Sequence, residues 1–510
     1  MAWSKYQNDI FEYALNPNNG SFVVSAVAGS GKTTTGVECA KRIHATYPEK
    51  TILFLAFNKS IADKLKTETD GLGMKCTTLH SFGLSALYKS NMKFIINPNK
   101  WRFFIKDKLN KLLDEDIPKK KEWIYIKNCD ELLRLCMINM VKSDDLVGIT
   151  NIAVKYGIIW VANEINAVQK LLKMSMNLFN FKKKDGIEID YTDMLCIPLT
   201  ESFRKYIFKF DVVFIDEAQD LSAIQQELML AAVKPGGKFI GFGDPNQSIN
   251  AFSGSLSDSF DQMYKKAGEH RLPLSVNYRC GKVIINEAQK IVPEIQPYEE
   301  MGPGEVMHQK DLSGIRNGDM VICRKTAPLI TVALNMMSRG ISCYIKGKDI
   351  AETMKTLLNK VYDENDNGIS MNRVYSKLDS MKEKMLESLD ENGAYNPQTH
   401  PAYISMCEMV EALKIVGQNC YGPGEIISML DKIFDDTQHG DAIMLSTVHK
   451  AKGLEAENVY IICPELLPMI FDKQQKWEYE QEMNLKYVAI TRAKKKLVWV
   501  DVAENEVIKL

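Results

Sequence analysis

The chain has 510 residues, 45% of them hydrophobic and 25% charged, and its formal net charge is −1. These values are ordinary for a globular protein and predict several domains. No stretch is long and apolar enough to span a bilayer, and the N-terminus lacks the charged-then-apolar order of a signal peptide. The eleven cysteines contain no CxxC pair, which argues against a zinc or iron–sulfur site. We therefore expect a cytoplasmic protein without a membrane partner.

The first predicted motif covers residues 22–36, "FVVSAVAGSGKTTTG", which indicate a strand, a glycine-rich turn and a helix. Such a turn lets backbone N–H groups surround phosphates, and the helix N-terminus adds its positive end. Lys32 would reach the β- and γ-phosphates, and the Thr33 hydroxyl would hold Mg²⁺. Ala26 stands where the strict pattern has glycine, but strand, turn, Lys-Thr pair and helix all favour a nucleotide site over an ordinary turn. The expected phosphate-binding residues are Ala28, Gly29, Ser30, Gly31, Lys32, Thr33 and Thr34.

Further strands and helices follow in alternation, which is typical of an α/β fold with parallel sheets. Two long helical and polar stretches interrupt this alternation, and each looks like an insertion. We expect two parallel-sheet domains, each interrupted by a mainly helical insertion. The predicted boundaries are 1–88 and 182–268 for the first α/β domain, 89–181 for its insertion, 269–348 and 440–510 for the second α/β domain, and 349–439 for its shorter insertion.

Two adjacent carboxylates end the apolar stretch "DVVFIDEAQD". Asp216 would hold Mg²⁺, directly or through water, and Glu217 would orient and deprotonate the attacking water. After a later strand, Gln247 in "GDPNQS" could bond both the γ-phosphate and that water. Each motif has a plainer interpretation, a helix N-terminal charge pair for the first and a turn for the second.

Two arginines occur far from the glycine-rich turn, Arg279 in "NYRC" and Arg492 in "AITRAK". Phosphoryl transfer spreads negative charge over the γ-phosphate in the transition state, and arginine side chains stabilise it. If both arginines come from the second α/β domain, the nucleotide sits between two domains, and hydrolysis would open and close the cleft.

The motifs together resemble the UvrD/Rep group of superfamily 1 DNA helicases, and "AFNKSIADK" also resembles the F-box DNA helicase branch. "AGSGKT", "IDEAQD", "GDPNQSI", "NYR", "TVHKAKGLE" and "YVAITRA" occur in the order and spacing of that family. The resemblance implies two RecA-like domains, an ATP and Mg²⁺ site, and a DNA helicase or translocase with ATP hydrolase activity.

Further residue roles rest on this resemblance. Gln7 resembles the glutamine that reads adenine, Tyr278 the aromatic that stacks on it, and Glu455 the ribose contact. Phe252 resembles an aromatic that stacks on a DNA base, which suits the use of aromatic rings as sequence-tolerant platforms. The remaining positions that resemble single-strand contacts are Asn58, Lys59, Thr78, His80, Arg324, Thr447 and His449.

The chain also departs from the family pattern. Thr34 stands where an arginine is frequent, and Ser253 replaces an arginine that links the DNA and nucleotide sites. Ala56 takes the place of a motif phenylalanine, with Phe57 one position later. The second insertion is short and lacks the family's glycine-rich duplex-binding hairpin motif, which counts against a family-like grip on duplex DNA.

These observations favour an ATP-dependent helicase and translocase on single-stranded DNA and tailed duplexes, with roles in repair, replication or recombination and partners from those processes. The "TVHKAKGLE" block favours 3′→5′ movement, because the opposite-polarity branch tends to have glutamine in place of Lys452. Two alternatives remain: a translocase that displaces proteins from single strands with little unwinding, and a regulatory ATPase that binds no DNA. The neutral net charge counts weakly against a nucleic-acid partner.

Overall fold

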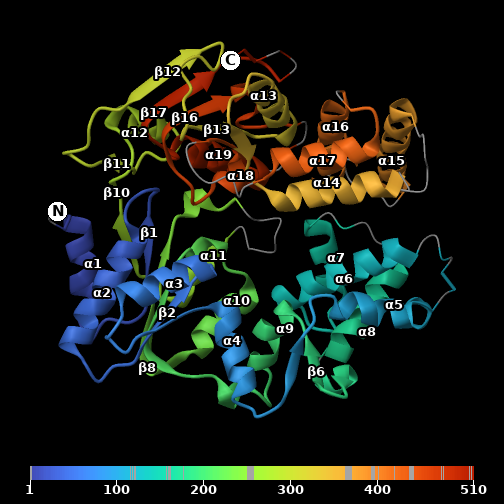
Figure 1. Cartoon of the computed structure of the whole chain (residues 1–510). Coiled ribbons are helices and arrows are strands. Elements are labelled where there is room, and N and C mark those ends of the chain that lie inside the picture. Colours follow the sequence, from blue (N-terminus) through green and yellow to red (C-terminus); the bar gives the residue numbers. More distant parts are fainter. Residues whose placement is uncertain are drawn as a thin grey trace. The chain divides into compact units, whose positions relative to one another are not determined.

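A computed structural model describes the chain in two compact units (Figure 1). The first unit comprises Met1–Ala26 and Gly31–Ser275, and the second comprises Val27–Ser30 and Val276–Leu510. The described residues are 3–510 except 115, 118, 120–121, 157, 159–161, 176, 250–257, 362–369, 392–396, 400, 419, 436–441, 472–473, 475, 505, 507 and 510.

A six-stranded parallel sheet forms the centre of the first unit, in the order β3-β2-β7-β8-β1-β9. Its central strands β1, β2 and β7 are largely apolar on both faces, as expected where helices cover both faces of a parallel sheet. Phe22 and Val24 pack into one hydrophobic cluster, and Val23 between them packs into the other. The strands are β1 (Phe22–Ala26), β2 (Ile52–Ala56), β3 (Lys75–Thr78), β7 (Phe210–Ile215), β8 (Val233–Gly243) and β9 (Arg271–Leu274). The helices of this α/β part are α1 (Lys5–Leu15), α2 (Lys32–Thr46), α3 (Lys59–Glu68), α4 (Leu79–Tyr88), α9 (Tyr191–Cys196), α10 (Ala223–Ala231) and α11 (Ser259–Lys266).

The predicted helical insertion of the first unit has a core of its own, built around the fully buried Trp101. Four helices form it: α5 (Lys100–Leu113), α6 (Glu122–Ile138), α7 (Leu146–Lys155) and α8 (Ala162–Ser175). A small sheet in the order β4-β6-β5 lies beside them, formed by β4 (Phe94–Ile96), β5 (Lys182–Lys183) and β6 (Gly186–Ile189). We did not expect this sheet, because its strands are only two to four residues long and carry little periodic signal.

The second unit repeats the architecture with a six-stranded parallel sheet in the order β12-β17-β16-β13-β15-β14. One hydrophobic cluster runs from this sheet into the second insertion, from Val321 and Leu329 to Leu413 and Leu430. The strands are β12 (Glu305–Gln309), β13 (Met320–Cys323), β14 (Cys343–Ile345), β15 (Ile443–Thr447), β16 (Ala456–Ile462) and β17 (Ala493–Val500), and β10 (Val276–Asn277) pairs separately with β11 (Gln296–Pro297).

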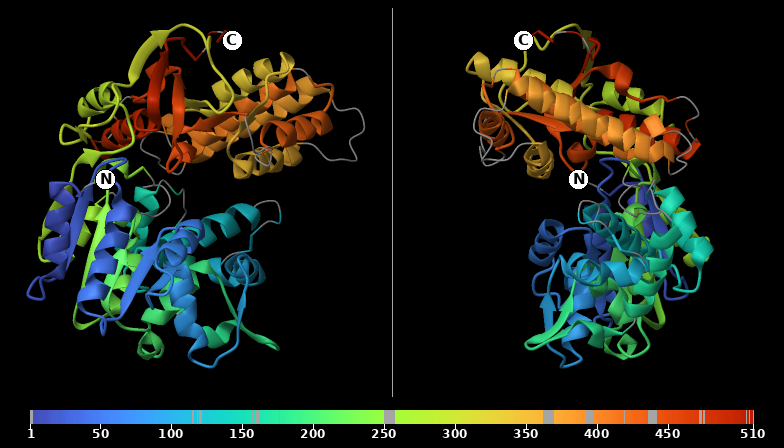
Figure 2. Two further views of the ribbon diagram at one scale, coloured as in Figure 1. Left: turned by 60° about the vertical axis from the view of Figure 1, so that its left-hand side comes forward. Right: turned by 90° about the vertical axis from the view of Figure 1, so that its right-hand side faces the viewer.

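Four helices in the insertion of the second unit pack side by side, as the views in Figure 2 confirm. They are α14 (Lys348–Val361), α15 (Met371–Glu391), α16 (Pro401–Gly417) and α17 (Pro423–Ile433). The other helices of this unit are α12 (Lys282–Gln289), α13 (Thr326–Ser338), α18 (Val448–Ala451) and α19 (Lys476–Ile490). Among the described residues, no helix has both the length and the apolar character needed to cross a membrane.

The compact units of the structure differ from one predicted boundary. We placed the end of the first α/β domain at residue 268, but β9 pairs with β1 in the sheet of the first unit, and that unit extends to Ser275. The short stretch Arg271–Leu274 contains a proline, and nothing local to it indicates which of two parallel sheets it completes.

Candidate nucleotide and DNA sites

The functional candidates of the first unit gather where its strands end. Parallel strands present their carboxyl ends at one edge of the sheet, and ligands of such folds bind there. The predicted nucleotide residues follow β1, β7 and β8, which are neighbours in the sheet. The residues predicted to contact single-stranded DNA follow β2 and β3, whose register pairs Ala56 with Thr78. One edge of the sheet therefore carries both the predicted nucleotide residues and the predicted DNA contacts. The two groups are adjacent because β2 pairs with β7.

The glycine-rich turn between β1 and α2 has the backbone that phosphate binding requires. Gly29 and Gly31 have φ angles of +64° and +78°, a region that residues with a Cβ rarely adopt. Gly31 is the N-cap of α2, so the free N–H groups of the first helical turn begin directly after it. The Ser30 hydroxyl is buried and has no hydrogen-bond partner among the described residues. A buried polar atom without a partner is costly, and a phosphate oxygen would supply one.

Lys32 and Thr33 meet the two predicted acids. The Thr33 Oγ1 donates to Asp216 Oδ2 at 2.9 Å, and Lys32 Nζ lies 3.4 Å from Glu217 Oε2. Glu217 has a left-handed backbone, with φ at +54°. Such strain in a residue that is not glycine is typical of functional sites. The structure thus brings together four residues that were predicted from separate motifs.

The charges at this edge are unbalanced. Burial raises the pKa of Asp216 to about 6, and the neighbouring Glu217 charge adds to that rise. Burial also raises the pKa of Asp244 to about 6. Burial alone would lower the pKa of Lys32, but the charges of Glu217, Asp244 and Asp216 outweigh it and raise that pKa. One lysine faces three acids, so negative charge is in excess around Lys32.

These residues fit ATP with Mg²⁺. Mg²⁺ prefers oxygen ligands and keeps several waters, and Thr33 with Asp216 offers a hydroxyl beside a carboxylate. The Ser30 hydroxyl, which has no hydrogen-bond partner in the described part of the chain, and the N-terminus of α2 fit the phosphates. When bound, Mg²⁺ would neutralise phosphate charge between these two oxygen ligands.

A glutamine that the sequence interpretation missed joins the motifs. Gln219 is buried, and its Nε2 donates to Glu217 Oε2 while its Oε1 accepts the backbone N–H of Asp244 at 2.9 Å. Asp244 in turn accepts from Gln247 Nε2 at 2.7 Å. The water-orienting candidate Glu217 is therefore connected to the γ-phosphate candidate Gln247 through Gln219 and Asp244, the latter by its backbone N–H and its carboxylate. The only available signal was the position of Gln219 inside "IDEAQD".

The adenine candidate Gln7 is held in place before any ligand binds. It lies in the first turn of α1, where it forms a capping box with Ser4. Its Nε2 donates to Thr35 Oγ1 at 3.0 Å. Thr34, the position that departs from the family pattern, is exposed in the first turn of α2, and Ala28 in the turn is fully buried.

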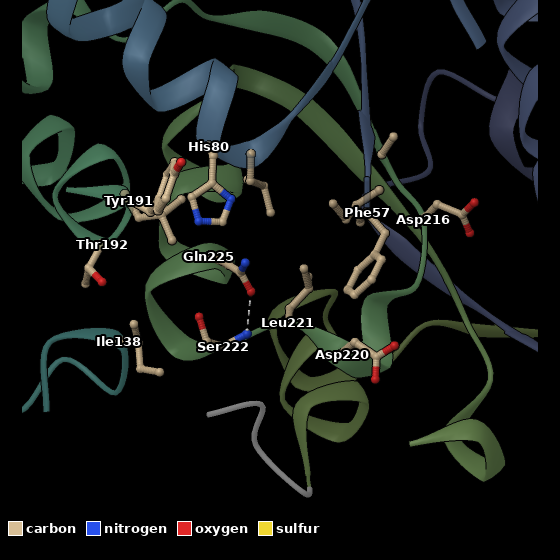
Figure 3. Close-up of a pocket in the computed structure, with 14 residues that line it drawn as sticks. Phe57, His80, Ile138, Tyr191, Thr192, Asp216, Asp220, Leu221, Ser222 and Gln225 are labelled. Carbon is tan, nitrogen blue, oxygen red and sulfur yellow. Dashed lines mark hydrogen bonds between the residues drawn. The ribbon is translucent and has the colours of Figure 1, made fainter. Parts of the chain in front are cut away.

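A pocket of about 310 Å³ lies beside the residues of the first unit that are predicted to contact DNA (Figure 3). Figure 3 shows the rings of Phe57, His80 and Tyr191 along its lining, whereas the carboxylate of Asp216 points away from the other lining side chains. Phe57 and Tyr191 are each 52% exposed, which is unusual for large aromatic side chains. Burial lowers the pKa of His80, so this ring is neutral at pH 7.

Two of the other residues predicted to contact DNA in this unit are helix N-caps. Asn58 accepts the backbone N–H of Ile61 as the N-cap of α3, and Thr78 accepts that of Ser81 as the N-cap of α4. Lys59 opens α3 and is exposed. These residues therefore surround helix N-termini, where backbone N–H groups favour phosphate. The Phe252 prediction, like that for Ser253, lies outside the described residues.

The predicted nucleotide residues of the second unit are already paired with each other. Arg279 Nε lies 2.6 Å from Glu455 Oε2, and Lys494 Nζ lies 2.7 Å from Glu455 Oε1. Burial would raise the pKa of Glu455, but these two cations lower it overall. Tyr278 contacts Tyr298 with ring centroids 4.9 Å apart. Neither Tyr298 nor Lys494 was singled out from the sequence.

Arg492 is 1% exposed, which was not expected of an arginine finger. Its guanidinium donates to the carbonyls of Val488 and Leu454 and to Thr491 Oγ1. Burial lowers its pKa to about 10, and the charge of Arg279 adds to that effect. Its role toward the γ-phosphate stays a prediction, and it would require these internal partners to be exchanged.

In the second unit, the residues predicted to contact single-stranded DNA lie at the ends of two adjacent β-strands. The register of β13 and β15 pairs Cys323 with Thr447, so Arg324 follows directly beside α18 and His449. Burial lowers the pKa of His449 to about 3, and the charges of Arg324 and Lys450 add to this effect. These effects favour the neutral form of the His449 ring.

Two family models match the chain. The UvrD/REP helicase N-terminal domain matches residues 7–268, and the UvrD-like helicase C-terminal domain matches residues 348–503. The chain belongs to the UvrD-like helicase family. The two matches confirm the resemblance and agree with the two parallel sheets.

Curated relatives of this UvrD-like chain include two F-box helicases and a yeast helicase. F-box DNA helicase 1 of Gallus gallus is 23% identical over 93% of this chain and 47% of the relative. F-box DNA helicase protein 1 of Schizosaccharomyces pombe is 24% identical over 97% and 57%. The ATP-dependent DNA helicase SRS2 of Saccharomyces cerevisiae is 25% identical over 53% and 25%. The chain spans about half the length of the F-box relatives.

Proposed function

We propose that this UvrD-like chain is an ATP-dependent translocase and helicase on single-stranded DNA. One observation supports this most directly: Asp216 bonds Thr33 of the nucleotide site and also lines the pocket that contains His80 and Phe57. A change in the bound nucleotide can therefore affect the predicted DNA contacts through a single residue, Asp216.

The nucleotide chemistry uses residues of the first unit. Lys32 exchanges Glu217 for the β- and γ-phosphates, and Thr33 and Asp216 are the residues that would hold Mg²⁺. Once separated from Lys32, Glu217 orients the attacking water and accepts its proton. Gln247 bonds the γ-phosphate. Because it is connected to Glu217 through Gln219 and Asp244, the presence of the γ-phosphate can affect the position of Glu217.

The second unit supplies positive charge to the transition state. Arg279 and Arg492 stabilise the γ-phosphate charge when ATP closes the two units, and hydrolysis releases them. The strand contacts of the two units would alternate between grip and release through this cycle. We propose 3′→5′ movement, which the "TVHKAKGLE" block supports.

A second candidate is a translocase that displaces bound proteins with little duplex unwinding. The second insertion favours it, because its described part consists of packed helices and its sequence lacks a glycine-rich duplex-binding hairpin motif.

The test is ATP hydrolysis with and without single-stranded DNA, followed by unwinding of 3′-tailed and 5′-tailed duplexes. We expect strong stimulation by single strands and unwinding of the 3′-tailed duplex. Absence of DNA stimulation would contradict the proposal and favour a regulatory ATPase. Stimulation without unwinding would favour protein displacement, and unwinding of only the 5′-tailed duplex would reverse the direction.

A further inference from the structure

Arg324 and Glu482 form an enclosed, bidentate ion pair in the second unit. Arg324 Nη2 donates to Glu482 Oε1 at 2.7 Å, and Nε lies 3.1 Å from both carboxylate oxygens. The two side chains are only 14% and 7% exposed. Glu482 Oε2 also accepts the backbone N–H of Met469 at 3.1 Å. The carboxylate thus holds both the end of β13 and the segment that precedes α19.

The guanidinium of Arg324 is the part that a DNA phosphate would use. An arginine fork binds carboxylate and phosphate with the same two-pronged geometry. Arg324 lies beside Thr447 and His449, which were also predicted as strand contacts, because β13 and β15 are adjacent. Glu482 therefore occupies the position of a ligand at this edge.

Glu482 is also connected to the nucleotide side of the same unit. It belongs to α19 (Lys476–Ile490), which ends two residues before Arg492. The helix from Glu482 to Ile490 spans about 12 Å. The Arg492 Nε donates to the Val488 carbonyl in the last turn of α19, so the arginine is fixed to the end of the helix.

We propose that Glu482 stands in for a DNA phosphate at Arg324, and that its replacement by the strand moves α19 and frees Arg492 for the nucleotide. The inference rests on the proposed function. Its physical reason is that a carboxylate this deeply buried cannot stay in place without its cation. When a phosphate takes the arginine fork, Glu482 must leave its enclosed position, and the helix that carries it must shift.

The central variant is Glu482→Gln, which keeps the shape and the acceptor for Met469 but removes the charge that competes with phosphate. We expect it to bind an oligo-dT strand roughly three- to tenfold more tightly than wild type in fluorescence anisotropy. Its hydrolysis of ATP without DNA should rise severalfold toward the stimulated rate. Glu480→Gln is the matched control, because it removes the same charge from an exposed position on the same helix.

A double-variant comparison separates competition from a general charge effect. In an Arg324→Gln background, Glu482→Gln should no longer raise strand affinity. Arg324→Gln alone should lower the salt dependence of strand binding by about 0.7 in the log–log slope, the value for one lost phosphate contact. An equal gain of affinity in both backgrounds, or unchanged affinity and basal hydrolysis in Glu482→Gln, would overturn the inference.

Hydrogen exchange on the unmodified chain gives a test that does not depend on any variant folding. Addition of oligo-dT should speed exchange at the Met469 amide, because its acceptor Glu482 moves away. Strand binding with unchanged protection there would overturn the inference but leave the proposed function intact. Failure of the wild-type chain to bind oligo-dT would contradict both.

Discussion

The two units build their sites at the same place in the same fold, yet they balance charge differently. In the first unit, Lys32 faces Asp216, Glu217 and Asp244. In the second unit, each of two arginines has its own glutamate, Arg279 with Glu455 and Arg324 with Glu482. The first edge therefore has an excess of negative charge that a metal ion would relieve. At the second edge, an anionic ligand must exchange with a glutamate that is already bound.

This difference assigns distinct chemistry to the two units. An excess of carboxylates suits metal binding and water activation, whereas paired arginines suit the recognition of phosphate by exchange. The variants below change one side of this comparison at a time.

The largest expected effect comes from Arg279→Ala in the second unit. Removing an arginine finger from phosphoryl transfer costs roughly 10³-fold or more in kcat. Glu455 keeps Lys494 as a partner, so the fold should tolerate the change. Steady-state ATP hydrolysis measures the effect, with the exposed Arg373→Ala as control. Wild-type turnover in Arg279→Ala would assign this arginine to structure alone.

Glu217→Gln in the first unit should lower kcat by roughly 10²- to 10⁴-fold, the usual contribution of a general base. Nucleotide binding should persist or tighten, because Lys32 loses its internal competitor. Binding of a fluorescent ATP analogue and single-turnover hydrolysis measure the two quantities separately. Glu227→Gln, which alters a surface ion pair with Lys266, provides the control. Near-normal hydrolysis would refute the assignment of Glu217.

Gln219→Ala breaks the connection between Glu217 and Asp244. The backbone N–H of Asp244 loses its buried acceptor, which should destabilise the chain by about 1–3 kcal/mol. We also expect hydrolysis to fall while nucleotide affinity changes little. Chemical unfolding and ATP hydrolysis test this, with the half-buried Gln262→Ala, outside this network, for comparison. A stability loss with unchanged kcat per folded molecule would mean that Gln219 only supports the fold.

The smallest expected effect concerns another buried acid of the first unit. Burial raises the pKa of Asp190 to about 7, and the Asp193 charge contributes further despite the nearby Lys100 and Arg134. Arg134 Nη1 lies 3.4 Å from Asp190 Oδ2, but the geometry does not make a hydrogen bond. An unfolded aspartate has a pKa of about 4, so the folded chain binds the additional proton between these values. The free energy of unfolding should therefore decrease as pH rises through this window and level off above pH 7.

Asp190→Asn should flatten this dependence and raise the melting temperature at pH 8 by a few degrees. The amide still accepts the backbone N–H of Asp193 through its oxygen. Thermal unfolding at pH 6 and pH 8 tests this, with the exposed Asp185→Asn as control. An unchanged slope in Asp190→Asn would show that this carboxyl remains ionised in the folded chain.

Sequence reasoning located features that depend on consecutive residues. The turn at Gly29 and Gly31 was predicted because positive φ angles and helix N-termini are local properties. Asp216 and Glu217 were found because they end an apolar strand. Boundaries and small sheets were harder to predict: the pairing of β9 with β1 extends the first unit past residue 268, and strand pairing is decided by residues far away in the chain.

The sequence by itself determined the family, the two parallel-sheet domains and the residue types of the nucleotide site, since each is encoded in short motifs. Only the tertiary structure decided how those residues are paired. Glu482 and Gln219 carry no motif signal of their own, yet one holds Arg324 and the other connects Glu217 to Asp244. The burial of Arg492 and the preference of His449 for its neutral form likewise follow from packing. The physical reason is that charge balance and desolvation depend on which distant segments surround a group, and sequence spacing does not record this.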